Sequence, residues 1–313
     1  MRLLTSLGGY AAGVVALGMG SAAMAQGLEL VGRPQDKMTG FQPAATELAR
    51  DLQGLDHMIL IIIAVITVFV TSLLLWVAFR FHEKRNAKPA TFTHNSPLEV
   101  AWTIVPILIL VFIGAFSLPV LFKQQEIPQG DITIKVTGYQ WYWGYEYVDD
   151  GITTDETAET VAFDSYMIGA PATGGDNRLT PEVSAQLAEA GYTDDEFLLA
   201  TDTAVVVPVG KTVVMQVTGA DVIHSWTIPA FGVKQDAVPG RLAHLWFAAE
   251  REGIYFGQCS ELCGIAHAYM PITIKVVSEE VYAQWLEAAK AGDVVLSAAD
   301  VEAYSAVKVA ASN

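Results

Sequence analysis

The chain of 313 residues has few sulfur ligands and, over most of its length, little positive charge. It contains only two cysteines, Cys259 and Cys263, and it lacks the Cys-x-x-Cys-His motif that attaches haem covalently. From residue 124 onward, 27 acidic side chains stand against 9 basic ones. We expect no nucleic-acid partner, because nucleic-acid binding requires positive charge. The acidic field either attracts cationic partners or serves solubility alone.

Charge is absent altogether from two stretches, residues 58–79 and 100–122. About 20 apolar helical residues span the ~30 Å hydrocarbon core of a bilayer. We therefore predict two membrane spans in a helical hairpin over residues 56–123. Two buried helices of a soluble protein are the alternative, which the closeness of the two runs disfavours.

The N-terminus has the features of a secretory signal peptide. Arg2 precedes a modest apolar stretch that ends in the small residues Ala23 and Ala25. We predict a signal peptide over residues 1–25 and an exported arm over residues 26–55. A third membrane helix is the alternative, but five glycines between residues 8 and 20 make it a poor one.

The link between the two spans sets their orientation. Residues 80–99 carry four basic side chains against two acidic ones. The positive-inside rule places this link in the cytoplasm. The mature N-terminus and everything after residue 123 then lie outside, which in a bacterium is the periplasmic side of the inner membrane.

Residues 124–290 have the pattern of an all-β domain. Val, Ile, Thr and aromatic residues recur in short runs separated by Gly, Pro and Asp, which is typical of a sandwich or small barrel. These runs are residues 131–147, 204–218, 242–249, 253–258 and 271–277. An acidic insertion, residues 149–200, holds one predicted helix that begins after Thr180 and stops at Gly191. A second helix is predicted over residues 278–292, and the tail, residues 291–313, is expected to be weakly ordered.

The two cysteines are followed closely by His267 and Met270. A Cys259–Cys263 disulfide is the simplest interpretation in an exported domain, but it would close a very short loop and leave His267 and Met270 unexplained. Thiolate, thioether and imidazole are ligands that copper prefers. A single electron-transfer copper uses one Cys, so both cysteines are used only if they bridge two copper ions.

Two copper ions require a second imidazole, and five other histidines are available. Three of them belong to the hairpin or its link: His57, His82 and His94. His244 lies in the middle of a predicted strand, where a packed histidine is expected. His224 lies at a strand end before Pro229, and we predict it as the second ligand.

With His224, the pattern C-x-E-x-C-x3-H-x2-M at residues 259–270 resembles the dinuclear copper centre, CuA, of bacterial cytochrome c oxidase subunit II. Residues 99–106 (EVAWTIVP), 140–143 (QWYW) and 236–241 (DAVPGR) resemble the same family. The resemblance covers nearly the whole mature chain, and the insertion departs from it. It implies a cupredoxin-like Greek-key barrel joined to the two-helix transmembrane hairpin.

The resemblance also implies a role for each ligand. Cys259 and Cys263 would bridge both copper ions, and His224 and His267 would each bind one. Met270 would be a weak axial ligand. The backbone carbonyl of Glu261 would be its counterpart on the other ion, while the Glu261 side chain binds a Mg²⁺ shared with subunit I.

By the same resemblance, the chain would accept electrons from cytochrome c and pass them to haem in subunit I. Oxygen would be reduced there with proton pumping, in a complex that also contains subunit III, and the chain would not be catalytic alone. Trp141 would receive the electron, with Trp143 as the alternative. Alternation along residues 139–147 also permits both rings to lie on a buried core face.

Four acidic residues receive roles from the resemblance as well. Asp221, Glu146 and Asp202 would dock cytochrome c together with Trp143, although each carboxylate alone is typical of an ordinary solvated surface. Glu99, at the start of the second span, would be the mouth of a proton path into subunit I. Residues 236–241 would contact subunit I near the haem propionates.

Three other proteins with related features are weaker interpretations. A quinol oxidase subunit II lacks the copper ligands. A nitrous oxide reductase lacks the hairpin and needs a large additional domain. A membrane-tethered copper chaperone or sensor would leave Glu99 and the aromatic strand unexplained.

Overall fold

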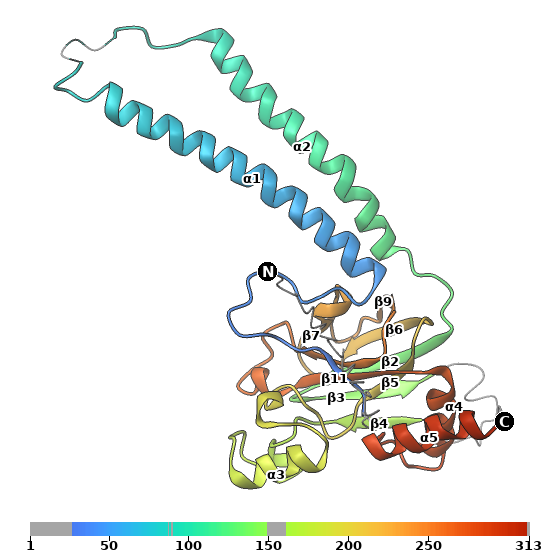
Figure 1. Ribbon diagram of the computed structural model, residues 1–313. Helices are drawn as coiled ribbons and strands as arrows, with labels where there is room; N and C mark the ends of the chain where they lie inside the picture. Colours follow the sequence, from blue (N-terminus) through green and yellow to red (C-terminus); the bar gives the residue numbers. More distant parts are fainter. Residues whose placement is uncertain (1–26, 87, 89, 149–160, 312–313) are drawn as a thin grey trace, which may run out of the picture.

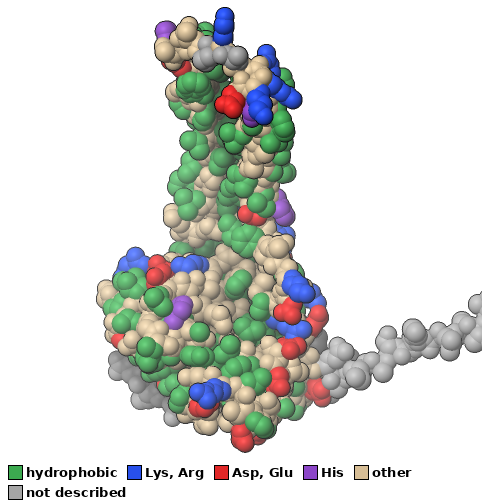
Figure 2. All heavy atoms as spheres, turned by 90° about the vertical axis from the view of Figure 1, so that its left-hand side faces the viewer, with side chains coloured by type: hydrophobic (Ala, Val, Ile, Leu, Met, Phe, Trp, Pro, Cys, Tyr) green, Lys and Arg blue, Asp and Glu red, His purple; other side chains and the backbone are tan. Residues whose placement is uncertain are grey.

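Two long helices project from a β-sheet domain in the computed structural model, which describes residues 27–86, 88, 90–148 and 161–311 (Figure 1). The predicted signal peptide lies outside these residues. Figure 2 shows hydrophobic side chains covering most of the hairpin, with basic groups gathered at its far end. This distribution is the one that a membrane-embedded hairpin requires.

The hairpin consists of α1 (Glu47–Arg80) and α2 (Ser96–Gln125). Both helices are long and apolar enough to cross a membrane, and their most apolar windows bury no residue within the chain. Helix α1 begins inside the segment predicted to be an exported arm, because the Thr46 side chain caps the Ala49 N–H. Lys123 forms ion pairs of 2.6 Å with Glu47 and Asp51, which join the outer ends of the two helices.

Three sheets form the domain. The five-stranded sheet has the order β4-β3-β2-β6-β9, the four-stranded sheet has the order β1-β10-β11-β5, and β7 pairs with β8. Buried Trp, Tyr and Phe side chains fill the core between them, among them Trp226 and Phe247 with ring centroids 6.3 Å apart. The strands are β1 (Leu30–Gly32), β2 (Ile132–Tyr139), β3 (Tyr142–Tyr147), β4 (Ala162–Ser165), β5 (Val205–Pro208), β6 (Thr212–Gly219), β7 (His224–Ile228), β8 (Val233–Ala237), β9 (Ala243–Ala248), β10 (Gly253–Gln258) and β11 (Pro271–Val277).

The run predicted over residues 131–147 is a hairpin of β2 and β3 rather than one strand. Tyr139 pairs with Tyr142, so Gln140 and Trp141 form the turn between them. The turn interrupts the alternation that places successive side chains on opposite faces. Trp143 is therefore fully buried, whereas Trp141 keeps part of its surface exposed.

The insertion contributes more regular structure than its sequence indicates. Strand β4 pairs with β3 and extends the five-stranded sheet. Helix α3 (Pro181–Glu189) begins after Thr180, as predicted, and the Thr180 side chain caps the Val183 N–H. The short helices η1 (Pro171–Thr173) and η2 (Asp194–Glu196) complete the described part of the insertion.

The C-terminal segment differs from its prediction. Helix α4 (Glu279–Lys290) lies where expected, but the tail that was expected to be weakly ordered forms α5 (Ala298–Ala311). Ser297 and Asp300 cap each other at its first turn, and Val301 is buried against the domain. The sequence signal is the Ser-x-x-Asp capping box before an alanine-rich run, a strong helix start. Figure 1 places α3, α4 and α5 at the end of the domain away from the hairpin.

Candidate metal centre

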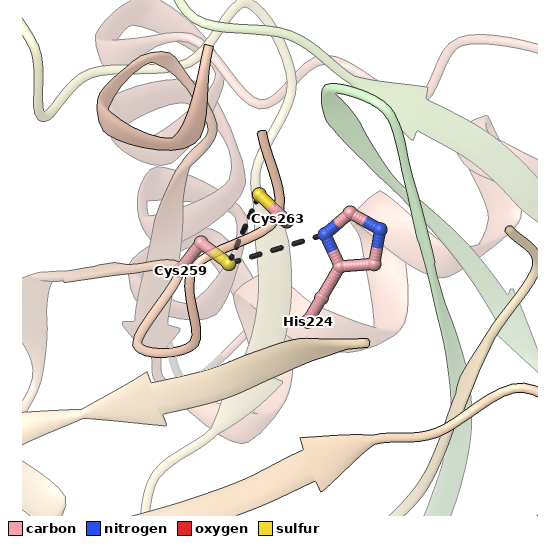
Figure 3. A group of neighbouring side chains, drawn as sticks. All are labelled: His224, Cys259 and Cys263. Carbon is pink, nitrogen blue, oxygen red and sulfur yellow. Dashed lines mark hydrogen bonds between the residues drawn. The ribbon is translucent and has the colours of Figure 1, made fainter. Parts of the chain in front are cut away.

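The predicted ligands converge from two places in the fold. His224 is the first residue of β7, and Cys259 follows directly after the end of β10. The loop predicted to bind copper, residues 259–270 and here called the copper-binding loop, then passes through η4 (His267–Tyr269) before β11 begins. Figure 3 shows the side chains of His224, Cys259 and Cys263 pointing toward one another.

Each ligand atom lies close to a thiol. The Cys259 Sγ is 3.8 Å from the Cys263 Sγ and 3.9 Å from the His224 Nδ1. The Cys263 Sγ is 3.6 Å from the His267 Nδ1 and 3.5 Å from the Met270 Sδ. All six predicted ligand groups are thus gathered, because the Glu261 carbonyl oxygen lies 3.2 Å from the Cys259 Sγ.

The geometry and the donor types fit copper better than a disulfide. A disulfide requires an S–S separation of about 2.05 Å, and the two thiols are free. The cysteines, His224 and Met270 are all buried, so water does not compete for these positions. Two thiols, two imidazoles and a thioether form a soft donor set of the kind copper prefers.

The two thiols differ in their electrostatic surroundings. Burial opposes ionisation of Cys259, but hydrogen bonds from His224 and the surrounding backbone lower its pKa below the ordinary thiol value. Burial and the neighbouring negative charge of Cys259 raise the pKa of Cys263. Because one thiolate disfavours the next, a cation between them is needed to stabilise both in the charged form.

His224 is held from its other ring nitrogen by Asp221. The His224 Nε2 lies 2.9 Å from an Asp221 carboxylate oxygen, which leaves Nδ1 directed at Cys259. The carboxylate also accepts hydrogen bonds from the backbone N–H groups of Gln140 and Val222. Burial opposes the Asp221 charge, yet its bond to His224 and these N–H groups lower its pKa. Such an outer carboxylate fixes the orientation and tautomer of a ligating histidine.

The β2–β3 turn closes the centre from one side. The Trp141 Nε1 and the Gln140 Nε2 each donate a 3.1 Å hydrogen bond to the Cys263 carbonyl. Gly264 is required here, because a Cβ would lie 3.1 Å from the Trp141 ring and its φ is +122°. Gln140 lies in the QWYW segment, but no role was predicted for it.

Trp143 has a different place from the one predicted. It is 0% exposed, and its Nε1 donates to the Met270 carbonyl at 3.1 Å. A buried ring cannot contact a docking partner, so its assignment to the docking surface is wrong. The ring packs at an angle against His224 with centroids 5.9 Å apart, which makes it part of the wall around the centre.

The predicted docking carboxylates are not equivalent. Asp221 keeps about a third of its side chain exposed (34%), although it is hydrogen-bonded to His224. Glu146 forms an ion pair of 2.8 Å with Lys135. Asp202 is exposed, but it accepts hydrogen bonds from the N–H groups of Tyr166 and Thr203. The Glu146 charge is therefore the most neutralised of the three.

Two further predicted residues lie apart from the thiol cluster. The Glu261 side chain is exposed on the copper-binding loop, where it is available to a partner. Glu99 is in the first turn of α2, at the end far from the domain, and accepts a 3.1 Å hydrogen bond from the Asn95 N–H. His244, expected to be packed, is exposed on β9.

Comparisons with known proteins agree with this geometry. The family described as cytochrome c oxidase subunit II matches through its periplasmic domain at residues 132–277 and its transmembrane domain at residues 34–120. Cytochrome c oxidase subunit 2 of Cereibacter sphaeroides is 69% identical over 299 residues, 95% of this chain and 96% of the relative. The Arabidopsis thaliana protein of the same name is 42% identical over 248 residues, 79% of this chain and 87% of the relative.

A solved structure is also similar to the domain. The crystal structure of the periplasmic domain of subunit II of cytochrome oxidase (CoxB) of Bradyrhizobium japonicum is 44% identical. The match covers 53% of this chain and 99% of that one, with a TM-score of 0.41. The family matches confirm the predicted class of protein, a transmembrane hairpin with a cupredoxin-like domain and a role in electron transport. The chain therefore belongs to the cytochrome c oxidase subunit II family.

Proposed function

We propose that this chain holds a dinuclear copper centre that receives electrons from cytochrome c and delivers them to haem in subunit I. The ligands would be His224, Cys259, Cys263, His267 and Met270 with the Glu261 carbonyl. The observation that carries the proposal is the continuous set of contacts, each 3.9 Å or shorter, that joins these groups through the two thiols.

Copper held by the two thiolates and the neighbouring ligands would supply a carrier for one electron at a time. The chain's own contribution is to keep the ligands in place while the charge changes. The Asp221 carboxylate holds the His224 ring. The side-chain N–H groups of Gln140 and Trp141 hold the Cys263 carbonyl, and both cysteines are buried. Because little would need to move when an electron arrives or leaves, this arrangement would favour fast electron transfer.

Trp141 is the proposed point at which the electron arrives. Its ring is partly exposed, and its Nε1 is hydrogen-bonded to the backbone of a thiol ligand. Among the rings predicted for this role, Trp143 touches Met270 and His224 but has no exposed surface. An electron donor outside the protein can approach Trp141 directly and Trp143 only through other groups.

Cytochrome c would dock beside Trp141 through the acidic surface. Asp221 lies at the turn that carries Trp141, because its carboxylate accepts from the backbone N–H of Gln140, the preceding residue. The negative charge of the sequence after residue 124 favours a cationic partner and increases its association rate. Asp202 and Glu146 would add to this field, the latter weakly because Lys135 neutralises it.

The hairpin would place the domain on the periplasmic side of the bacterial inner membrane, with the basic link in the cytoplasm. Glu99 would then lie at the cytoplasmic surface, where it can take up protons for subunit I. On the copper-binding loop, the exposed Glu261 carboxylate would bind the Mg²⁺ shared with subunit I. Subunit III would complete the complex.

A rapid-mixing experiment tests the proposal. Reduced cytochrome c is mixed with the oxidised complex carrying either wild-type chain, Cys259→Ser or the control Ser260→Ala, and haem oxidation is followed. We expect the control to behave as wild type and Cys259→Ser to lose fast oxidation by at least about 100-fold, because a bridging ligand is removed. Oxidation of cytochrome c by Cys259→Ser at the wild-type rate would contradict the proposal.

A further inference from the structure

The end of the insertion contacts both strands that flank the copper-binding loop. We propose that residues 196–201, here called the bracing turn, hold this loop in its ligating conformation, and that Glu196 is the positioning residue that anchors the turn. The inference rests on the proposed function, because it gives the insertion a part in that same metal centre. It also assigns a part to the N-terminal arm.

Three hydrogen bonds join the bracing turn to the two flanking strands. The Gln258 Nε2 donates to the Leu198 carbonyl at 3.1 Å. The Thr273 Oγ1 donates to the Leu199 carbonyl at 3.3 Å and accepts from the Thr201 N–H at 3.2 Å. Gln258 directly precedes Cys259, and Thr273 lies three residues after Met270. The two strands pair directly, with Gln258 opposite Pro271, and the turn adds side-chain contacts to both of them beside the loop.

Glu196 is a buried carboxylate that organises the turn. Its side chain is 0% exposed and lies 2.6 Å from the Arg33 guanidinium. One carboxylate oxygen accepts from both the N–H and the hydroxyl of Thr193, at 2.9 and 2.7 Å. Burial opposes its charge, but Thr193 and Arg33 lower its pKa below the ordinary value. A buried carboxylate is stable only with such a complete set of partners.

The backbone of the bracing turn has a conformation that its contacts impose. The N–H groups of Leu199 and Ala200 both donate to the Glu196 carbonyl. Leu198 lies in the turn that these two hydrogen bonds close. Its φ is +70°, a left-handed backbone conformation that residues with a Cβ rarely adopt. Such strain persists only where surrounding contacts impose it, and it is frequent near functional sites. Here it directs the Leu198 carbonyl to Gln258.

The N-terminal arm completes the brace from the other side. Strand β1 pairs in parallel with β10, the strand that leads to Cys259. Gly32 allows this approach, because a Cβ there would lie 2.5 Å from the Tyr255 ring. Arg33 follows immediately and neutralises Glu196. The arm thus contacts both β10 and the bracing turn, so two segments far apart in sequence, the arm and the turn, lie against the strand that leads into the copper-binding loop.

Removing the Glu196 charge should loosen the loop more than the rest of the domain. Glu196→Gln keeps the size of the side chain but weakens the bond to Arg33, and Thr273→Val keeps the shape while removing both hydroxyl bonds to the turn. Arg50→Gln is the matched control. Arg50 forms a comparable ion pair with Glu250 between α1 and the segment after β9, with no contact to the bracing turn.

The test measures copper and loop mobility in the complete oxidase. Copper loss to a copper(I) chelator under reducing conditions should be about tenfold faster in Glu196→Gln and Thr273→Val than in wild type, with an altered copper resonance spectrum. Arg50→Gln should match wild type. A loss rate within twofold of wild type in both variants would overturn the inference, as would equal acceleration in Arg50→Gln.

Hydrogen exchange in the copper-free complex separates this inference from the proposed function. Amides of residues 259–270 should exchange several-fold faster in Glu196→Gln than in wild type, whereas those of β2 and β6 should not change. This result is independent of any bound metal. Unchanged exchange of the loop would reject the brace even if the chain binds two copper ions.

Discussion

The indole Nε1 of Trp141 donates a 3.1 Å hydrogen bond to the backbone carbonyl of Cys263. This bond joins a partly exposed ring to a buried thiol ligand. The turn between β2 and β3 makes the contact, because it directs Trp141 away from the core face that Trp143 occupies. Of Trp141 and Trp143, the two rings predicted to receive the electron, only Trp141 combines exposed surface with a hydrogen bond to a predicted ligand residue.

Replacing Trp141 by Phe should slow electron transfer from cytochrome c without loss of copper. Phe lacks the Nε1–H, so the contact with the Cys263 carbonyl is lost. We expect a decrease of at least tenfold, equivalent to about 1.4 kcal/mol of transition-state stabilisation. Stopped-flow reduction of the oxidase measures it, with Trp246→Phe as the control because Trp246 bonds to Lys123 at the membrane side. Equal rates in both variants would remove Trp141 from the route.

The acidic surface should make turnover depend on salt. At ~0.15 M salt, charges more than about 8 Å apart are largely screened. We expect kcat/KM for cytochrome c to fall steeply as salt rises. The value of kcat/KM at low salt should fall most in Asp221→Asn, less in Asp202→Asn and least in Glu146→Gln. The last effect is smallest because Lys135 already neutralises the Glu146 carboxylate. A flat salt dependence of the wild-type complex would contradict docking by this surface.

Glu99→Gln should slow proton uptake while leaving the copper centre unchanged. The Gln side chain can still accept the Asn95 N–H at the start of α2, so the helix cap survives. Loss of a proton-transferring group typically slows such a step by about 100-fold or more. Proton uptake is followed with a pH dye in detergent solution. Glu99→Asp, which keeps the acid, should retain more activity; a wild-type rate in Glu99→Gln would refute the role.

Lys275 should destabilise β11 at neutral pH. It is partly buried and donates to the Leu296 carbonyl, and desolvation lowers its pKa to about 8. In the unfolded chain, Lys275 keeps its proton up to about pH 10.4. The free energy of unfolding should therefore rise between pH 8 and that value, because only the folded chain loses the proton there. Below pH 8 the partly buried lysine is charged and its full desolvation cost applies.

Lys275→Met should remove this pH dependence. The substitution should stabilise the strand by about 1–2 kcal/mol at pH 7. This gain is smaller than the free energy equivalent to the full pKa shift of Lys275, because the hydrogen bond to the Leu296 carbonyl is also lost. Hydrogen exchange of β11 amides at pH 7 and 9.5, corrected for intrinsic rates, provides the measurement. Lys211→Met is the control, because Lys211 is only half-buried and its ammonium is paired with Glu279 at 3.0 Å. A variant that exchanges as wild type at both pH values would be incompatible with the shift.

The clustering of the predicted ligands could be expected from sequence because most of the set is local. Five of its six groups lie within twelve residues, and the choice of His224 followed from its position at a strand end. Both apolar helices could be predicted for a similar reason, since each is one continuous run. The Ser297 capping box of α5 is also local, although the tail that contains it was expected to be weakly ordered.

What could not be predicted depends on contacts between distant segments. Trp141 and Trp143 occupy equivalent positions in an alternating strand, and only the two-residue turn at Gln140 separates an exposed ring from a buried one. Arg33 and Glu196 are 163 residues apart, and neither side chain has a sequence pattern that indicates pairing. The part played by the insertion therefore becomes visible only in the folded chain.

The central claim is that both thiols bind the same two copper ions. Counting copper in the oxidase and recording the electron paramagnetic resonance spectrum of the centre tests it most directly. We expect two copper ions in this chain and a seven-line hyperfine pattern, because one unpaired electron would be shared equally by two spin-3/2 nuclei. One copper with four lines, or no copper and a Cys259–Cys263 disulfide, would contradict it.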